Sequence, residues 1–256
     1  MTLPNFLIIG AAKSGTSSLR KYLNQHPQVF ADVASEPGFF AFEGANPQFA
    51  GPGDDIVNKA VVTELGDYEH LFESVSNESA IGEASVVYLY SEKSPQRIKQ
   101  YIPNVKFIVI LRNPVERAVS SYYHLVRDGF EPFVDFSLAL AAEDERIRLN
   151  WQHLWHYKRM GMYHDQLCRY FRLFRAEQFA IFTYDEFSAD PSTVLKQIFK
   201  FLDVEDTFLP DLSRRYNVSG NPKSRFLHSL LTRPSLARSI LKPIVPKQYG
   251  IGCRPH

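Results

Sequence analysis

The sequence predicts an α/β fold in a single domain, with a central parallel sheet flanked by helices and a P-loop-like strand–turn–helix at the N-terminus. Short apolar runs typical of buried parallel strands alternate along the chain with segments of helical spacing. Val105–Leu111 is the clearest of these runs. No break in composition marks a second unit among the 256 residues, so we expect residues 1–256 to form one domain around one sizeable core.

The chain is expected to begin with a strand, a glycine turn and a helix. Asn5–Gly10 is a short apolar run that ends in glycine, as a buried strand does. Thr16–Leu23 follows with leucines four residues apart, and Pro27 ends this helix because the residue before a proline avoids the helical conformation. Ser35–Asp55 is rich in Gly, Pro and Phe and has no period, so we expect a loop over a cleft.

The remaining elements continue the alternation. After the strand at Val105–Leu111, a helix is expected from about Val115 to Val126, with Pro114 suited to its first turn. The other expected elements are helices at Gly66–Phe72, Ser94–Tyr101, Pro191–Leu202 and about Ser224–Leu231, a strand with its exit at Ala80–Tyr90, helical segments from Ser137 to Arg175 broken near Gly161, a strand at Gln178–Thr183 and a turn at Asp185–Ser188.

The composition is that of a soluble globular protein and excludes several functions. Hydrophobic residues make up 45% and charged residues 22% of the chain, and the net charge of +1 gives no field that would favour nucleic acid. Cys168 and Cys253 match neither a metal site nor a disulfide framework, which favours a reducing compartment. No apolar run is long enough for a membrane span or a leader, so we expect a cytoplasmic protein; its oligomeric state has no signature in the sequence.

The turn Gly10–Thr16 predicts an anion site at the end of the first strand. Unpaired N–H groups and the positive end of the helix dipole meet there, and Gly10 and Gly15 let an anion approach the backbone. Lys13 adds a full charge. A tight connection with a solvent-facing lysine is the alternative, but it leaves a cluster of hydroxyl donors unexplained: Ser14, Thr16, Ser17 and Ser18.

This turn differs from the ATP-binding P-loop. In that motif the lysine follows the second glycine, whereas Lys13 precedes Gly15. Nucleotide hydrolases also place an aspartate after a later strand to hold magnesium, and here Arg112 follows the strand. The pattern favours a ligand held by donors and positive charge without a metal. A metal-dependent P-loop nucleotide kinase is the alternative enzyme.

Arg112 and Ser120 form a second candidate anion site. Arg112 follows a strand, where open α/β sheets bind ligands, and its guanidinium can donate two hydrogen bonds to a phosphate. Ser120 lies about two helical turns further on and can donate a third. Alternatively, Arg112 pairs with a carboxylate and Ser120 faces the next helix. Together with the first turn, the pattern indicates a nucleotide with phosphates at both ends.

These residues carry a family resemblance. Phe6–Leu23 resembles the 5′-phosphosulfate loop of sulfotransferases that use 3′-phosphoadenosine 5′-phosphosulfate (PAPS), and Phe107–Tyr123 resembles their 3′-phosphate segment. Within that family the chain is most similar to bacterial, heparan-sulfate and polyketide-associated members. The likeness continues through Gly82–Ser85, Gly161–Leu167, Thr183–Phe187 and Phe201–Val204.

The resemblance implies transfer of a sulfuryl group from PAPS to an acceptor hydroxyl by in-line displacement, leaving the bisphosphate product PAP and using no metal. Lys13 would contact the oxygen that bridges phosphate and sulfur. Ser14–Ser18 would hold the 5′-phosphate, and Arg112 with Ser120 the 3′-phosphate. A late basic loop carries Lys223 and Arg225. These two side chains either reach the 3′-phosphate or form a solvated turn.

The resemblance also indicates Glu36 as the base that takes the acceptor proton. Alternatively, Glu36 is a loop carboxylate that caps backbone amides. Three positions depart from the related carbohydrate enzymes: Ser35 replaces a lysine, Gly38 a histidine and Ala84 a lysine found in some relatives. Further groups are candidates for contact with the acceptor, although structural roles are the alternative for the histidines: Glu83, His124 and His156.

The acceptor is expected to be a small-molecule or carbohydrate hydroxyl. Aromatic and mixed-charge segments at Glu36–Asp55 and Asp128–Met162 are expected to shape its pocket, and they lack the basic groove that a long polyanion needs. Because the family residues are absent at Ser35, Gly38 and Ala84, a non-catalytic relative that only binds the nucleotide is the other alternative.

Overall fold

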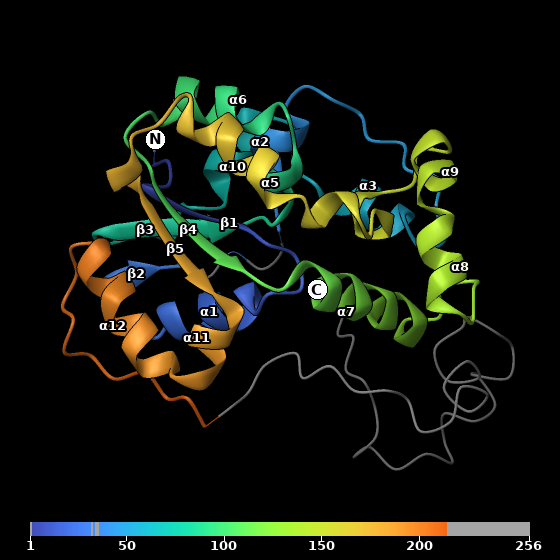
Figure 1. The fold of residues 1–256 in the computed structure, drawn as a ribbon. Coiled ribbons are helices and arrows are strands. Elements are labelled where there is room, and N and C mark those ends of the chain that lie inside the picture. Colours follow the sequence, from blue (N-terminus) through green and yellow to red (C-terminus); the bar gives the residue numbers. More distant parts are fainter. Residues whose placement is uncertain (1, 32, 34–35, 214–256) are drawn as a thin grey trace, which may run out of the picture.

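The structure, a computed structural model, describes residues 2–31, 33 and 36–213. Within them the strands form one parallel sheet of order β2-β3-β1-β4-β5 (Figure 1). This confirms the predicted α/β class and the central parallel sheet. The strands are β1 (Phe6–Gly10), β2 (Val29–Phe30), β3 (Ala80–Ala84), β4 (Lys106–Leu111) and β5 (Phe179–Thr183).

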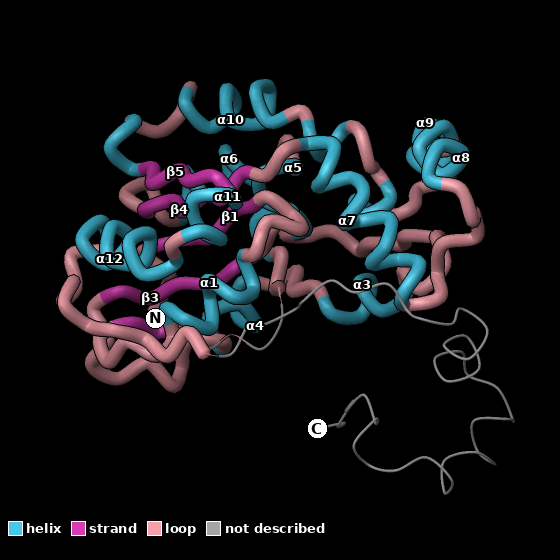
Figure 2. The backbone as a smooth tube through the Cα atoms, turned by 60° about the horizontal axis from the view of Figure 1, so that its bottom comes forward, coloured by secondary structure: helices cyan, strands magenta, loops and turns pink. Residues whose placement is uncertain are grey.

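Helices cover both faces of the sheet, so the molecule has three layers (Figures 1 and 2). Alternate residues of the central strand β1 enter opposite cores: Leu7 packs into one cluster and Ile8 into the other. The first core is closed by α2 (Phe39–Phe42), α5 (Val87–Tyr90), α6 (Ser94–Tyr101) and α10 (Tyr163–Phe171), and the second by α1 (Thr16–Leu23), α11 (Tyr184–Ala189) and α12 (Pro191–Phe201).

A third group of helices lies beyond the carboxyl ends of the strands. The longest is α7 (Pro114–Arg127), which begins with proline at its first position. The Asn113 side chain accepts hydrogen bonds from the N–H groups of Val115 and Glu116 and so caps this helix. The helical segments of the described residues that are not yet named, in this group or elsewhere, are α3 (Asp55–Ala60), α4 (Leu65–His70), α8 (Phe136–Ala141), α9 (Glu143–Arg148), η1 (His153–Trp155), η2 (Arg159–Gly161) and η3 (Ala176–Gln178).

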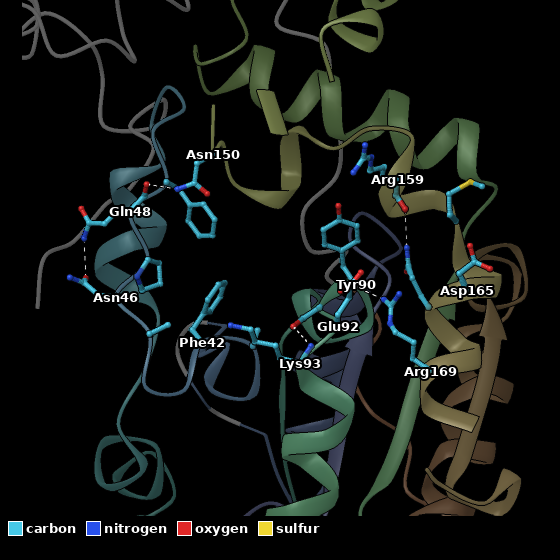
Figure 3. A pocket seen from close by; sticks show the side chains of 17 residues that line it. Phe42, Asn46, Gln48, Tyr90, Glu92, Lys93, Asn150, Arg159, Asp165 and Arg169 are labelled. Atoms are coloured by element: carbon cyan, nitrogen blue, oxygen red, sulfur yellow. Dashed lines mark hydrogen bonds between the residues drawn. The ribbon is translucent and has the colours of Figure 1, made fainter. Parts of the chain in front are cut away.

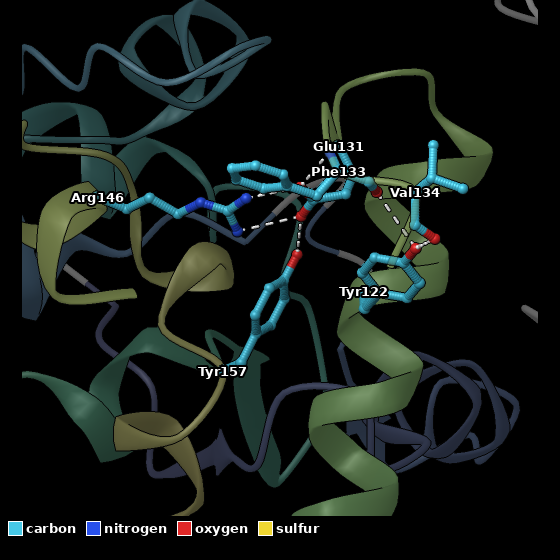
Figure 4. Close-up of polar contacts among 6 residues, drawn as sticks. All are labelled: Tyr122, Glu131, Phe133, Val134, Arg146 and Tyr157. Atoms are coloured by element: carbon cyan, nitrogen blue, oxygen red, sulfur yellow. Dashed lines mark hydrogen bonds and ion pairs between the residues drawn. The ribbon is translucent and has the colours of Figure 1, made fainter. Parts of the chain in front are cut away.

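A buried ion pair fixes the loop that follows α7 (Figure 4). Arg146 Nη2 lies 2.6 Å from Glu131 Oε1, and both side chains are almost entirely buried. Tyr157 donates its hydroxyl to the same carboxylate at 2.5 Å. Tyr122, on α7, donates to the carbonyl of Val134 at 2.5 Å, so the far end of the loop is joined to α7, while the Glu131 end is held by Arg146 and Tyr157.

The expected elements agree with the structure except at four places. The predicted turn at Asp185–Ser188 is wrong, because α11 begins there with a capping box between Thr183 and Glu186. The expected loop Ser35–Asp55 contains α2, and neither the helix α3 nor the short strand β2 was expected. The strand expected with its exit at Ala80–Tyr90 is β3, which ends at Ala84 and is followed by α5. The expected helix at Ser224–Leu231 lies outside the described residues.

Candidate active site

A cavity of about 890 Å³ opens at the carboxyl ends of the central strands. The sheet order puts β3 on one side of β1 and β4 on the other, so the segments that leave these three strands meet there. Ligands of open α/β sheets bind at such a reversal of strand order. The cavity is lined by residues that follow each of the three strands, among them Lys13 after β1, Val86 after β3 and Arg112 after β4.

The turn after β1 adopts the backbone conformation that an anion site requires. Lys13 and Gly15 both lie in the left-handed region, with φ of 67° and 84°. A side chain at Gly15 would also meet Phe187, 3.3 Å from the position of an added Cβ. Thr16, Ser17 and Ser18 line the cavity with Lys13 and Gly15. The Ser14 side chain is instead fully buried and does not line the cavity, and the Ser14 N–H donates to the carbonyl of Ala11 at 3.3 Å.

The charge on Lys13 depends on its surroundings. Burial, together with the nearby charge of Arg127, lowers the pKa of Lys13 from 10.5 to about 8. The amine is therefore charged at neutral pH but close to titration. Within the residues that the structure describes, no group of three or more His, Cys, Asp or Glu is arranged to hold a metal ion. Lys13, Arg112 and Arg127 are the cationic side chains among the described residues that line the cavity.

Arg112 joins the two predicted anion sites. Its Nη1 donates to the carbonyl of Lys13 at 3.3 Å, and its guanidinium stacks over the Tyr184 ring at 4.5 Å. Its Nε and Nη2 both lie 3.2 Å from Glu116 Oε2, so the pairing with a carboxylate considered above is present. Because the Glu116 side chain is 55% exposed, this ion pair is weak and can be exchanged for a ligand phosphate.

One face of α7 brings three polar residues to the cavity: Ser120, His124 and Arg127. Burial, with the charge of Lys13, lowers the pKa of His124 to about 4, so the ring is neutral at pH 7. Arg127 Nη2 donates to His124 Nδ1 at 2.6 Å. The ring proton is therefore assigned to Nε2, and in this tautomer His124 donates a hydrogen bond and cannot accept a proton at that atom.

Glu36 lies in the same cavity, on the side of β3. The N–H of Val86 donates to its Oε2 at 3.1 Å, so the carboxylate caps a backbone amide while it also faces the cavity. The Glu36 residue is exposed to solvent, but protein atoms lie around its carboxyl group. The desolvation that these atoms cause raises the pKa of Glu36. The Val86 N–H and the charges of Arg20 and Lys13 act in the opposite direction. A carboxylate with a raised pKa is suited to accept a proton.

Glu83 lies beneath the Glu36 loop and not in the cavity. Its side chain is fully buried, accepts from Tyr68 Oη at 3.1 Å and from Ser85 Oγ at 2.8 Å, and has a pKa raised by burial to about 7. Ser85 Oγ in turn accepts from the N–H of Gly38 at 2.9 Å. The structure therefore does not bring Glu83 to an acceptor, and places it where it supports the backbone that carries Glu36.

His156 is the second expected residue that the cavity does not include. Its Nδ1 lies 2.9 Å from the hydroxyl of Tyr90, and its Nε2 lies 3.1 Å from the carbonyl of Trp151. The nearby His153 lines the cavity instead, and burial lowers the pKa of this histidine to about 3. The expected nucleotide-binding residues Lys223 and Arg225 lie outside the described part of the chain, as does Ser35, where the sequence departs from the family.

The sequence analysis missed several residues of this cavity. Arg127 could have been found from helical spacing, because residues 120, 124 and 127 repeat at i, i+4 and i+7. Tyr184 and Phe187 line the cavity from α11, which was expected to be a turn. Ile56 and Val57, on α3, have no local signal that places them near β1.

A second and more open cavity of about 810 Å³ shares Phe42 with the first (Figure 3). Arg169 lines it and donates to the carbonyls of Leu89 and Tyr90, so its guanidinium is held by the end of α5. Asn150 donates to the carbonyl of Gln48 across the cavity rim. The side chains drawn there come from α2, α5, η2 and α10 and from the segments that follow α2, α5 and α9.

Sequence comparison identifies the family to which the chain belongs. The profile of the sulfotransferase family matches residues 4–208. The chain belongs to this family. A sulfotransferase from Alicyclobacillus acidocaldarius has the same fold, with 41% identity, a TM-score of 0.80, and coverage of 85% of this chain and 87% of that one. The expected family is therefore confirmed, and membership implies sulfuryl transfer.

The curated relatives of this sulfotransferase are longer proteins. Human heparan sulfate glucosamine 3-O-sulfotransferase 6 is 27% identical over 206 residues, which cover 79% of this chain and 53% of the relative. The membrane-associated sulfotransferase kil1 of Dictyostelium discoideum is 31% identical over 127 residues, which cover 50% of this chain and 24% of that protein. No helix among the described residues of the present chain has the length and apolar character to cross a membrane.

Proposed function

We propose that this sulfotransferase moves a sulfuryl group from PAPS to an acceptor hydroxyl by in-line displacement, and that residues 1–256 act as a single sulfotransferase domain. The observation that carries the proposal is the arrangement of one cavity. Lys13 and Arg112 line it at the ends of neighbouring strands, and Glu36 lines it beside them. Two cationic sites suit a nucleotide with phosphates at both ends, and the carboxylate suits the removal of a proton from a hydroxyl.

The side chains that line the cavity have different roles in the proposed reaction. Lys13, with the hydroxyls of Thr16, Ser17 and Ser18, stabilises negative charge that develops on the departing 5′-phosphate. Arg112 and Ser120 hold the 3′-phosphate and so fix the position of the nucleotide. The acceptor oxygen forms a bond to sulfur while the bond from sulfur to the bridging phosphate oxygen breaks, and the hydroxyl proton passes to Glu36.

His124 has a different role from that of Glu36. Because its Nδ1 accepts from Arg127, the neutral ring of His124 has only its Nε2–H to offer a ligand, and this group is a hydrogen-bond donor. It can orient a sulfuryl or acceptor oxygen, but the proton must go elsewhere. Among the residues that the structure describes around the cavity, Glu36 is the only carboxylate, which supports its assignment as the base.

Incubation of the purified protein with PAPS and a panel of alcohols, followed by mass spectrometry, tests the proposal. We expect a sulfate ester and an equal amount of PAP. The Glu36→Gln variant removes the base and keeps the size of the side chain, so kcat is expected to fall by roughly 10²- to 10⁴-fold with little change in PAP affinity. PAP binding without transfer to any acceptor would favour a non-catalytic relative, and magnesium-dependent ATP turnover would favour the kinase alternative.

A further inference from the structure

The helix α3 presents an apolar face to the reaction cavity. None of its residues is buried, yet Ile56, Val57 and Ala60 all line the cavity, and Val61 continues the same wall. The Ile56 side chain is 58% exposed. Large apolar side chains that gather at a concave site, in place of a core, mark a surface that contacts an apolar ligand.

This apolar wall lies next to the proposed base. The N–H of Val62 donates to the carbonyl of Pro37 at 2.8 Å, which joins the end of the wall to the residue after Glu36. Phe42 and Val61 are the nearest side chains to Gly38, at 3.0 and 3.7 Å from the position of an added Cβ. A molecule whose hydroxyl reaches Glu36 can therefore place its body against these side chains.

Polar contacts hold α3 from its other side. The Asn58 side chain accepts from the N–H of Phe49 and donates to its carbonyl, both at 2.9 Å. Asp54, buried just before the helix, accepts from Trp155 Nε1 at 2.9 Å and from the N–H of Gln152 at 2.8 Å. The helix is thus fixed by hydrogen bonds that leave its apolar face uncovered. Figures 1 and 2 both place α3 outside the sheet layers, on the same side of the molecule as α7.

The cations of the cavity come from elements other than this wall. Among the described lining residues, the cations are Lys13, Arg112 and Arg127, which belong to the turn after β1, the end of β4 and α7. Phe42, Val86, Val87 and Leu154 add further apolar surface to the cavity lining. A sugar chain needs many hydrogen-bond partners along its length, and α3 presents none to the cavity.

We infer that the acceptor is an alcohol carried on an apolar aliphatic or aromatic body, which packs against Ile56, Val57 and Val61 while its hydroxyl meets Glu36. This inference rests on the proposed sulfuryl transfer and names its substrate class. The hydroxyl oxygen bonds to sulfur, the bridging phosphate oxygen leaves on PAP, and the proton goes to the Glu36 carboxylate. The product is a sulfate monoester with an apolar tail, unlike the glucosamine acceptor in the name of the human relative.

A series of linear alcohols from 1-butanol to 1-octanol tests the inference, with methyl glucoside as the polar comparison. Each methylene placed against the wall adds about 0.8 kcal/mol, or roughly three- to fourfold in affinity. From butanol to octanol, kcat/KM is therefore expected to rise on the order of 100-fold. Calorimetry with the PAP-saturated protein measures the binding of the same alcohols in the absence of turnover.

Two matched variants locate the effect. Ile56→Asp places a charge on the wall and is expected to weaken octanol binding roughly tenfold or more, since about 1.4 kcal/mol corresponds to tenfold. Leu138→Asp is the control, because Leu138 is 57% exposed on α8 and does not line the cavity. Both changes are at exposed positions, so the unfolding temperature is expected to stay constant, and PAP affinity reports an intact nucleotide site.

The outcomes separate this inference from the proposed function. Affinities that do not change with chain length, or an Ile56→Asp variant that binds octanol like the wild type, overturn the inference even if methyl glucoside is sulfated. Chain-length-dependent binding that Ile56→Asp abolishes, without any sulfated product, supports the apolar site and contradicts the sulfuryl transfer instead.

Discussion

The pKa of Lys13 leads to a quantitative prediction for the pH dependence of kcat/KM. Burial and the charge of Arg127 lower this pKa from 10.5 to about 8. A lysine is charged below its pKa, so roughly nine-tenths of the free enzyme carries the charge at pH 7 and about one-tenth at pH 9. If the charged amine is needed, kcat/KM falls as pH rises through about 8 and then drops roughly tenfold per unit. In the PAPS complex, the ligand's negative charge raises this pKa, so kcat is expected to fall only at higher pH.

The Lys13→Arg variant identifies the titrating group. Arginine stays charged above pH 12, so the alkaline decline of kcat/KM is expected to disappear, although the absolute rate falls because a guanidinium does not reproduce the position of an amine. Initial rates with saturating acceptor and limiting PAPS, from pH 6 to 10, measure both profiles. A wild-type profile that is level to pH 10, or a decline that persists in Lys13→Arg, would refute the reasoning.

Two further changes test the nucleotide site and the core. Arg112→Ala removes the equivalent of one charged hydrogen bond, about 1.5–3 kcal/mol, so calorimetry should show PAP binding weakened roughly 10- to 100-fold, with adenosine 5′-phosphate little affected; equal losses for both nucleotides would place Arg112 away from the 3′-phosphate. Arg146→Ala leaves the Glu131 carboxylate buried without its cation, and urea unfolding should show a loss of about 3–5 kcal/mol; a loss under about 1 kcal/mol would contradict a buried pair.

The central strands and the nucleotide turn could be predicted because their signals are local. β1 and β4 are short apolar runs, and the glycines and hydroxyls after β1 lie within a few residues of one another. β2 escaped prediction because Val29 and Phe30 are too few to show a period. The helix α11 had a readable signal, since Thr183 and Glu186 form a capping box, but the polar residues between them resemble a turn.

The acceptor side of the cavity could not be read from sequence, because it depends on contacts between distant segments. The segment that contains α3 is positioned by long-range contacts: the N–H of Val62 donates to the carbonyl of Pro37, and the Asn58 side chain accepts from the N–H of Phe49. Glu83 was a candidate for contact with the acceptor because the family residues are absent at Ser35, Gly38 and Ala84. Side chains alternate along a strand, however, and Glu83 points into the layer that contains Tyr68.

The single face of α7 has a mechanical consequence. Ser120 and Arg127 are seven residues apart, which corresponds to about 10 Å along a rigid helix at 1.5 Å per residue. The same helix therefore carries Ser120, a contact for the proposed 3′-phosphate, and Arg127, the group that orients His124. The separation of these two residues cannot change as loops move. One residue inserted between them would rotate Arg127 by about 100° out of the cavity. The distance between the donor side and the acceptor side of the cavity is thus fixed by the geometry of α7.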